Sequence, residues 1–178
     1  GTKKALDGGQ LDAPDMTLSA GVTEIGKSAF EHCTALTSVT VPGNVRHIGE
    51  SAFSSCDNLT SVAIGSGVQS IGAFAFNWCG SLASITLPDS AKSIGSNAFG
   101  GCKGLTGMTI PKNVTSIGKG AFLTCVGLME INVDPENATY RSENGVLYNK
   151  EKTEIVCYPK NKPDTSFILP ESVTSIVD

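Results

Sequence analysis

Residues 22–44 read VTEIGKSAFEHCTALTSVTVPGN, and this 23-residue pattern returns four more times without an insertion, so that five copies fill residues 22–136. The copies begin at Val22, Val45, Val68, Ala91 and Val114. Every copy has Ile-Gly at positions 4 and 5, Ala-Phe at 8 and 9, Cys at 12 and Leu at 15. Such a fixed period is typical of a solenoid, because a unit this small cannot bury its apolar residues alone and must stack on its neighbours.

The unit divides into three local structures. Its end, as in residues 39–41 and 85–87, alternates apolar and polar side chains and predicts a short strand with one buried face. Proline follows this strand at Pro42, Pro88 and Pro111 and ends it, because proline has no N–H group for a ladder. The V-x-x-I start predicts a second extended piece, ended by a Gly that can adopt backbone conformations other residues resist. The A-F-x-x-C spacing predicts a short helical or 3₁₀ turn.

The Ile-Gly, Ala-Phe, Cys and Leu positions at this spacing resemble the leucine-rich repeat class, and more narrowly the BspA-like (Treponema pallidum type) repeats of 23 residues. The resemblance covers residues 16–137 continuously. It implies a repeat solenoid with a ladder of parallel strands, short helical turns and a hairpin insertion near the C-terminal end.

The ends of the array depart from the template. The chain starts at Gly1 without an initiator Met, and residues 1–15 show no periodicity and are interpreted as a leader segment. The solenoid is assigned to residues 16–178, with a half-repeat strand at 16–18, an insertion at 138–166 and a partial repeat at 167–178 whose Phe167–Leu169 stretch is predicted as a further strand. Counting both flanking strands predicts a ladder of seven. The insertion is predicted to be a β-hairpin, because two apolar stretches flank the polar residues 149–152.

Composition excludes several classes of protein. With 40% hydrophobic and 17% charged residues, the chain of 178 residues can bury a core and is not intrinsically disordered. A net charge of −4 argues against nucleic acid as a partner. The longest apolar runs are only a few residues, which excludes a bilayer-spanning helix. No phosphate loop or dinucleotide fingerprint is present, and no cofactor is expected.

Cysteine and histidine chemistry is also not expected. The Cys of each repeat should lie in a row at the strand spacing of about 4.8 Å, with parallel side chains whose Cβ atoms are too far apart for a disulfide. These thiols are therefore interpreted as small buried hydrophobes, and the absence of C-x-x-C argues against a metal site. His32 lies beside Cys33 but should point elsewhere, so no catalytic pair is predicted and the chain is not expected to be an enzyme. The recurring cysteines are Cys33, Cys56, Cys79, Cys102 and Cys125.

Two places depart from the template toward aromatic residues and are the candidate partner-binding sites. Phe74 and Trp78 replace small or polar residues of the other repeats, and Trp78 faces Gly100-Gly101 of the next copy. Either the indole covers this glycine floor, or the two rings form an exposed contact patch.

The hairpin insertion is the second candidate, since it combines tyrosine with interleaved charge. Its candidate contact residues are Tyr140, Arg141, Tyr148, Lys150 and Lys152. The alternative is that the hairpin only covers the array and seals its end.

Function at this stage follows from the resemblance. It implies a non-catalytic binding module, secreted or at a bacterial cell surface, with a host or extracellular-matrix protein as partner. The alternative is a structural spacer or assembly segment of a larger surface protein. A surface binder should be monomeric, whereas a spacer with uncapped ends should self-associate.

Overall fold

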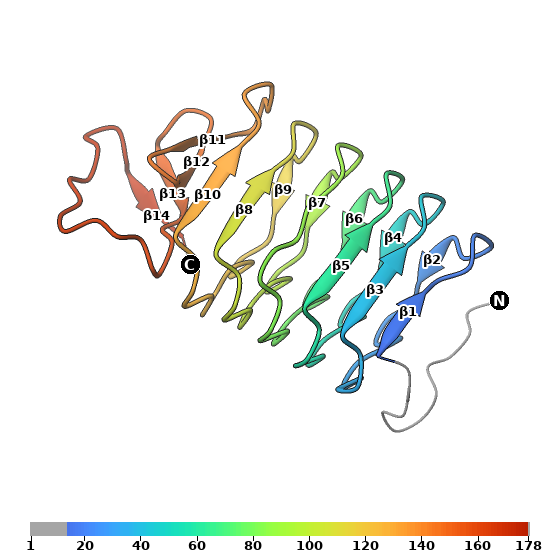
Figure 1. Ribbon diagram of the computed structural model, residues 1–178. Helices are drawn as coiled ribbons and strands as arrows, with labels where there is room; N and C mark the ends of the chain where they lie inside the picture. Colours follow the sequence, from blue (N-terminus) through green and yellow to red (C-terminus); the bar gives the residue numbers. More distant parts are fainter. Residues whose placement is uncertain (1–13, 178) are drawn as a thin grey trace.

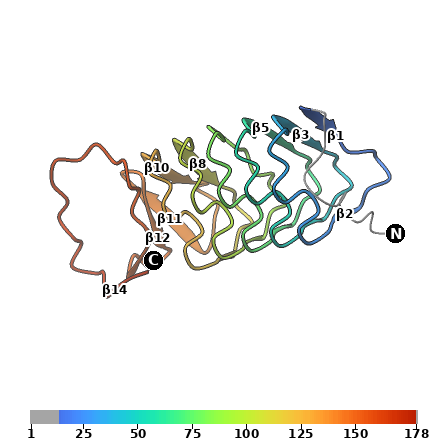
Figure 2. The same ribbon diagram turned by 90° about the horizontal axis from the view of Figure 1, so that it is seen from below.

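Residues 14–177, which the computed structural model describes, form an elongated coil in which each turn of the chain is one repeat (Figure 1). The longer strands lie along one side of this coil and the two-residue strands lie behind them (Figures 1 and 2). The predicted repeat solenoid is confirmed. The predicted leader lies outside the described residues up to residue 13, and Asp15 already belongs to the first strand.

The strands fall into three groups. The longer strands are β1 (Asp15–Thr17), β3 (Ser38–Val41), β5 (Ser61–Ile64), β8 (Gly107–Ile110) and β10 (Glu130–Val133). The short strands are β2 (Glu24–Ile25), β4 (His47–Ile48), β6 (Ser70–Ile71), β7 (Ser93–Ile94) and β9 (Ser116–Ile117). After the array come β11 (Tyr140–Glu143), β12 (Val146–Asn149), β13 (Glu154–Cys157) and β14 (Ser175–Ile176). Strands therefore supply the regular secondary structure of residues 14–177.

The short strands form one continuous parallel sheet, and the longer strands form two. The order β2-β4-β6-β7-β9 places the position-4 isoleucines side by side along the whole array. The longer strands pair as β1-β3-β5 and β8-β10. The third repeat, which lies between β5 and β8, has no long strand. Its Ile85 and Leu87 are buried as the strand residues of other repeats are, but the segment pairs with no sheet of residues 14–177.

The predicted ladder of seven strands is therefore wrong, at the third repeat and also at its C-terminal end. Residues 167–170 do not form a strand, and Ile168 is 89% exposed. The physical reason is the hairpin: β11, β12 and β13 occupy the end of the array, and β13 pairs with β14. Phe167 packs edge-on against Tyr158 at 4.9 Å between ring centroids, in the wide loop that Figure 2 shows.

The turns are not helical, which corrects the prediction of short helical turns. Residues 14–177 contain no α- or 3₁₀-helix. Positions 7 and 11 of every repeat have a left-handed backbone, with φ between 53° and 74°. These residues are Ser28, Ser51, Phe74, Asn97 and Gly120 at position 7, and His32, Ser55, Trp78, Gly101 and Thr124 at position 11. A left-handed residue in each half of the segment interrupts right-handed helical geometry, although the apolar spacing is that of a helical turn.

This backbone conformation connects each repeat to the next. The N–H groups at positions 7, 9 and 11 donate to the carbonyls at positions 6, 8 and 10 of the following repeat, in twelve bonds of 2.7–3.1 Å. In the third repeat, for example, the acceptors for Phe74, Phe76 and Trp78 are the carbonyls of Ser96, Ala98 and Gly100. All these donors point toward the C-terminal end of the array, so the turns form a polar ladder of their own, here named the turn ladder.

The fixed glycine after each position-4 isoleucine is required by close approach between repeats. It has no left-handed φ, which corrects the conformational role expected from the sequence. A Cβ atom added at Gly72 would lie 2.6 Å from the backbone of Gly49, and one added at Gly95 would lie 2.4 Å from the backbone of Ala73. Any side chain here would push neighbouring repeats apart.

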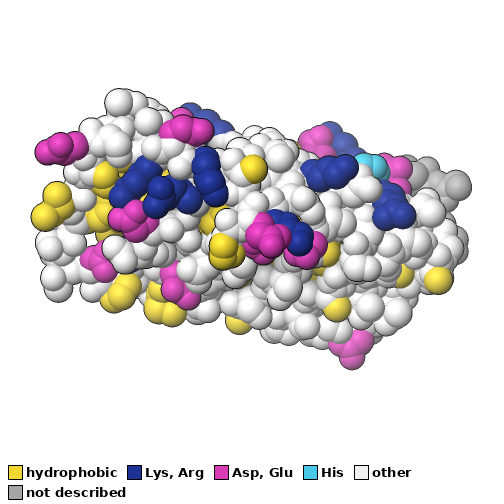
Figure 3. Space-filling model, turned by 90° about the horizontal axis from the view of Figure 1, so that it is seen from above, with side chains coloured by type: hydrophobic (Ala, Val, Ile, Leu, Met, Phe, Trp, Pro, Cys, Tyr) yellow, Lys and Arg dark blue, Asp and Glu magenta, His cyan; other side chains and the backbone are white. Residues whose placement is uncertain are grey.

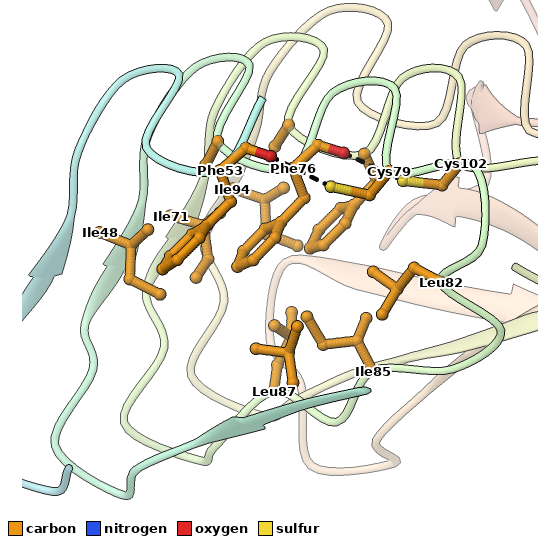
Figure 4. Packing of buried hydrophobic residues seen from close by; sticks show 14 of the residues in the cluster. Ile48, Phe53, Ile71, Phe76, Cys79, Leu82, Ile85, Leu87, Ile94 and Cys102 are labelled. Atoms are coloured by element: carbon orange, nitrogen blue, oxygen red, sulfur yellow. Dashed lines mark hydrogen bonds between the residues drawn. The ribbon is translucent and has the colours of Figure 1, made fainter. Parts of the chain in front are cut away.

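The core consists of columns of identical side chains (Figure 4). The phenylalanine rings stack with centroids 5.3–5.9 Å apart and nearly parallel planes. Each thiol from the second repeat onward donates to the carbonyl of the phenylalanine one repeat earlier, as Cys79 does to Phe53 at 3.2 Å. The interpretation of the repeat cysteines as buried hydrophobes is confirmed, and all five are free thiols.

The predicted hairpin is confirmed and enlarged. β12 pairs antiparallel with β13 as expected, and β11 adds a strand that the sequence did not predict. Leu147 joins the main core, while Val146, Tyr148 and Ile155 form a small cluster of their own. The insertion thus covers part of the C-terminal end of the array.

Burial of the repeat thiols should lower their reactivity and make the stability of the fold depend on pH. It raises the pKa of Cys56 and Cys125 from the ordinary 9.0 to about 12. We expect the five repeat cysteines to resist iodoacetamide in the native protein and to react after denaturation. Because these thiols ionise in the unfolded chain near pH 9 but stay protonated in the fold, the free energy of unfolding should fall as pH rises from about 9 to 12. A disulfide between any two of them in mass spectra, or equal alkylation rates of native and denatured protein, would contradict this.

Candidate functional site

The aromatic pair of the third repeat stands on backbone that bulky residues seldom adopt. Phe74 and Trp78 both have a φ of 58°, a conformation that costs a non-glycine residue on the order of 1–3 kcal/mol. The turn ladder imposes it, because their N–H groups donate to the next repeat at 2.9 and 2.7 Å. Other repeats have Ser, Asn, Gly, His or Thr at these positions. The left-handed backbone conformation therefore does not explain why these two positions have aromatic side chains.

The indole of Trp78 is packed on the next repeat and is also partly exposed. It lies over Gly101, where an added Cβ atom would come within 2.7 Å of its Cε3 atom, and the Lys103 ammonium lies 5.5 Å from the ring centroid. The glycine floor expected from the sequence is confirmed at Gly101, whereas a Cβ atom at Gly100 would meet the Asn77 side chain. Nevertheless 48% of Trp78 and 41% of Phe74 stay exposed, so both rings are accessible to a partner.

The tyrosines of the hairpin are structural. Tyr148 is only 2% exposed, and Lys152 lies 5.6 Å from its ring centroid, so its expected role as a contact residue is wrong. Tyr140 is half-buried, and its hydroxyl accepts a hydrogen bond from the Ile117 N–H at 3.0 Å, which satisfies the edge of β9. Burial raises the pKa of the Tyr140 phenol above its usual range. Both tyrosines therefore fit the alternative, in which the hairpin covers the array and seals its end.

The charged residues of the hairpin mainly hold it together. Lys152 forms an ion pair with Glu143 at 2.7 Å, and Arg141 contacts the same carboxylate at 3.5 Å. The hydrogen bond from Lys152 lowers the pKa of Glu143. The Lys150 ammonium donates to the carbonyl of Asn137. Arg141 and Lys150 are exposed and remain accessible as candidate contacts.

Asn137 is an anchor that sequence reasoning missed. It is fully buried, and its amide donates to the carbonyls of Pro111 and Val114 at 2.7 and 3.0 Å. Its side-chain oxygen accepts from the N–H groups of Thr139 and Tyr140, where the hairpin begins. The only sequence signal was a turn asparagine at the junction after a repeat, as at Asn113.

Charged side chains of both signs are spread along the array. Figure 3 shows Lys and Arg side chains over both halves of the face seen there, with Asp and Glu side chains beside them. Within residues 14–177, no three His, Cys, Asp or Glu side chains are grouped so as to hold a metal ion. The same residues include no helix that could cross a bilayer. The exposed Phe74 and Trp78 are therefore the residues whose presence the stability of the fold explains least.

The chain matches a known repeat family. A family described as "BspA type Leucine rich repeat region" matches residues 23–154 in six copies. Among curated proteins, none matches the chain.

Several solved structures are similar to it over almost its whole length. A leucine-rich repeat protein from Eubacterium ventriosum is 31% identical, with a TM-score of 0.85, over 92% of this chain and 43% of that one. A leucine-rich cell surface protein from Faecalibacterium prausnitzii is 30% identical, with a TM-score of 0.69, over 91% of this chain and 56% of that one. The leucine-rich repeat protein of T. pallidum is 27% identical, with a TM-score of 0.70, over 93% of this chain and 69% of that one. In the first two cases this chain spans about half of the other protein.

The packing of Trp78 can be tested by adding one methyl group. We expect Gly101→Ala to displace the indole and to introduce left-handed strain at a φ of 74°, destabilising the fold by about 1–3 kcal/mol. Trp78 is the sole tryptophan, so its fluorescence should shift to longer wavelength. Gly80→Ala is the matched control, because a Cβ atom there meets nothing within 4 Å. An unchanged emission spectrum for Gly101→Ala would show that the indole does not rest on this glycine.

Proposed function

The chain belongs to the BspA-type leucine-rich repeat family, and from this premise we propose that it is a non-catalytic protein-binding module of a bacterial cell-surface or secreted protein. The leucine-rich repeat fold presents a long regular surface suited to protein interaction. A structural relative from Faecalibacterium prausnitzii is described as a cell surface protein, which supports the proposed location. The proposed partner is a host or extracellular-matrix protein.

The observation that carries this proposal is the exposed aromatic pair. Phe74 and Trp78 each hold a left-handed backbone that Ser, Asn or Gly would adopt at lower cost, and roughly half of each side chain remains exposed. Tryptophan is among the residues that contribute most to binding energy when they are desolvated at the centre of an interface. Residues retained at a cost to stability indicate selection for something other than folding.

The neighbourhood of the pair suits a protein partner. The Lys103 ammonium lies 5.5 Å from the centroid of the indole ring, and the Lys103 residue is exposed. A large exposed ring beside a charge can act as an anchor with a polar rim. Arg141 and Lys150 of the hairpin are exposed, and we propose that their charges steer the partner during its approach to the array.

The experiment replaces the aromatic residues with those that other repeats use. Phe74→Ser copies Ser28 and Ser51, and Trp78→Ser copies Ser55, so the double variant has residues that the same turn already accommodates and should fold as the parent does, which circular dichroism checks. Binding to purified extracellular-matrix proteins should weaken at least about thirtyfold, the loss typical of a hot spot of about 2 kcal/mol.

Two controls make the result interpretable. Val126→Ser removes an apolar side chain that is 55% exposed on the fifth repeat, and it should bind as the parent does. Arg141→Ala should change the association rate and its salt dependence more than the dissociation rate. If the Phe74/Trp78 double variant binds every matrix protein as tightly as the parent, the aromatic pair is not the binding surface.

A further inference from the structure

The turn ladder ends with three N–H groups that have no acceptor among residues 14–177. In the first four repeats, the donors at positions 7, 9 and 11 are satisfied by the next repeat. In the fifth repeat these positions are Gly120, Phe122 and Thr124, and their N–H groups have no hydrogen-bond acceptor among residues 14–177. Gly120 and Phe122 are buried residues, for which an unsatisfied donor is costly.

These donors line a groove. Its volume is about 810 Å³, within the usual range of ligand sites, and residues 117–124 form one wall. The opposite wall comes from the hairpin and the C-terminal segment, at residues 154–160 and 176–177. The hairpin therefore leaves open the part of the end where the turn ladder would continue.

We propose that this groove binds a peptide segment of a protein partner in the turn conformation of a repeat, which pairs its backbone carbonyls with the N–H groups of Gly120, Phe122 and Thr124. The four interior junctions show the required geometry, because each places three carbonyls from alternate residues on three donors. A peptide backbone presents such a row, whereas one small anion cannot reach all three donors. Addition of a chain to an exposed edge is a known mode of peptide recognition.

The side chains of the groove restrict which peptide fits. Val156, Tyr158 and Ile176 give the wall an apolar surface, and Ile176 is 66% exposed. At interior junctions a small Ala stands between the outer two carbonyls and is followed by a Phe that stacks on its neighbour's ring. The peptide should therefore carry a small residue followed by an aromatic residue, the latter placed over Phe122.

A second copy of this chain is the competing occupant. The carbonyls of Lys27, Ala29 and Glu31 in the first repeat have no donor among residues 14–177 and form the complementary edge. However, the hairpin stands beside the donors as the second wall of the groove, and a flat solenoid end would have to enter between the two walls. A single short peptide segment needs only the groove. This inference does not depend on the aromatic pair of the third repeat.

The test uses a peptide that fills the same donors inside the fold. Residues 94–101, IGSNAFGG, supply the three carbonyls that accept from the third repeat, so this sequence, with blocked ends, is the probe. In NMR spectra of the whole chain, we expect the amide signals of Gly120, Phe122 and Thr124 to shift with the peptide. The amides of Asn97, Phe99 and Gly101, already bonded at an interior junction, should not shift.

Matched variants separate the groove from the rest of the surface. Ile176→Lys places a charge in the groove and should weaken peptide binding at least about tenfold, whereas Ile168→Lys alters an exposed side chain outside it and should have no effect. The reversed sequence, GGFANSGI, should bind more weakly than the probe. Absence of binding in the millimolar range, or shifts confined to other amides, overturns the proposal. Self-association of the parent that Ile176→Lys abolishes also overturns it, because the occupant is then a second copy.

Discussion

The fold depends on the backbone hydrogen bonds by which each repeat donates to the next one along its turn. These bonds require a left-handed residue on either side of the Ala-Phe pair, and they set the spacing at which the phenylalanine rings stack. The same spacing leaves no room for a Cβ atom at the glycine after the position-4 isoleucine, as at Gly72. It also brings each thiol within reach of the preceding phenylalanine carbonyl, as for Cys102 and Phe76. One repeated junction thus explains most of the residues that never vary.

The direction of these bonds makes the two ends of the array chemically different. Among residues 14–177, carbonyls of the first repeat and N–H groups of the fifth are unpaired, so the two ends need different partners. The hairpin satisfies only part of the C-terminal end: Tyr140 binds the N–H group of Ile117, while Asn137 fixes the start of the insertion. The donors at Gly120 and Phe122 lie in the part that remains. Because the core follows from the repeat, features that set this protein apart must lie at Phe74 and Trp78 or at this end.

Much of the fold could be predicted from the sequence, because the repeat states which side chains are buried. The position-4 isoleucines, the position-9 phenylalanines and the position-12 cysteines lie in the core as expected, except that Phe30 and Ile117, near the two ends, are only partly buried. The left-handed turns could not be predicted, because their apolar spacing equals that of a helical turn and their conformation is set by bonds between repeats. The burial of Tyr148 could not be predicted from the sequence either, since tyrosine interleaved with charged residues occurs both at interfaces and, as here, where a lysine lies over a buried ring. Phe167–Leu169 has the composition of a strand but lies outside the sheets, because the hairpin occupies that end.

Hydrogen exchange of the phenylalanine amides tests the central claim most directly, because the same residue type stands at position 9 of every repeat. The amides of Phe53, Phe76 and Phe99 donate to the next repeat, and that of Phe122 has no acceptor among residues 14–177. In the free protein, the account predicts that the first three exchange only when the array opens, while Phe122 exchanges by local fluctuation and much faster. Equal protection of Phe122 and Phe99 would contradict a stability that resides in directed bonds between repeats.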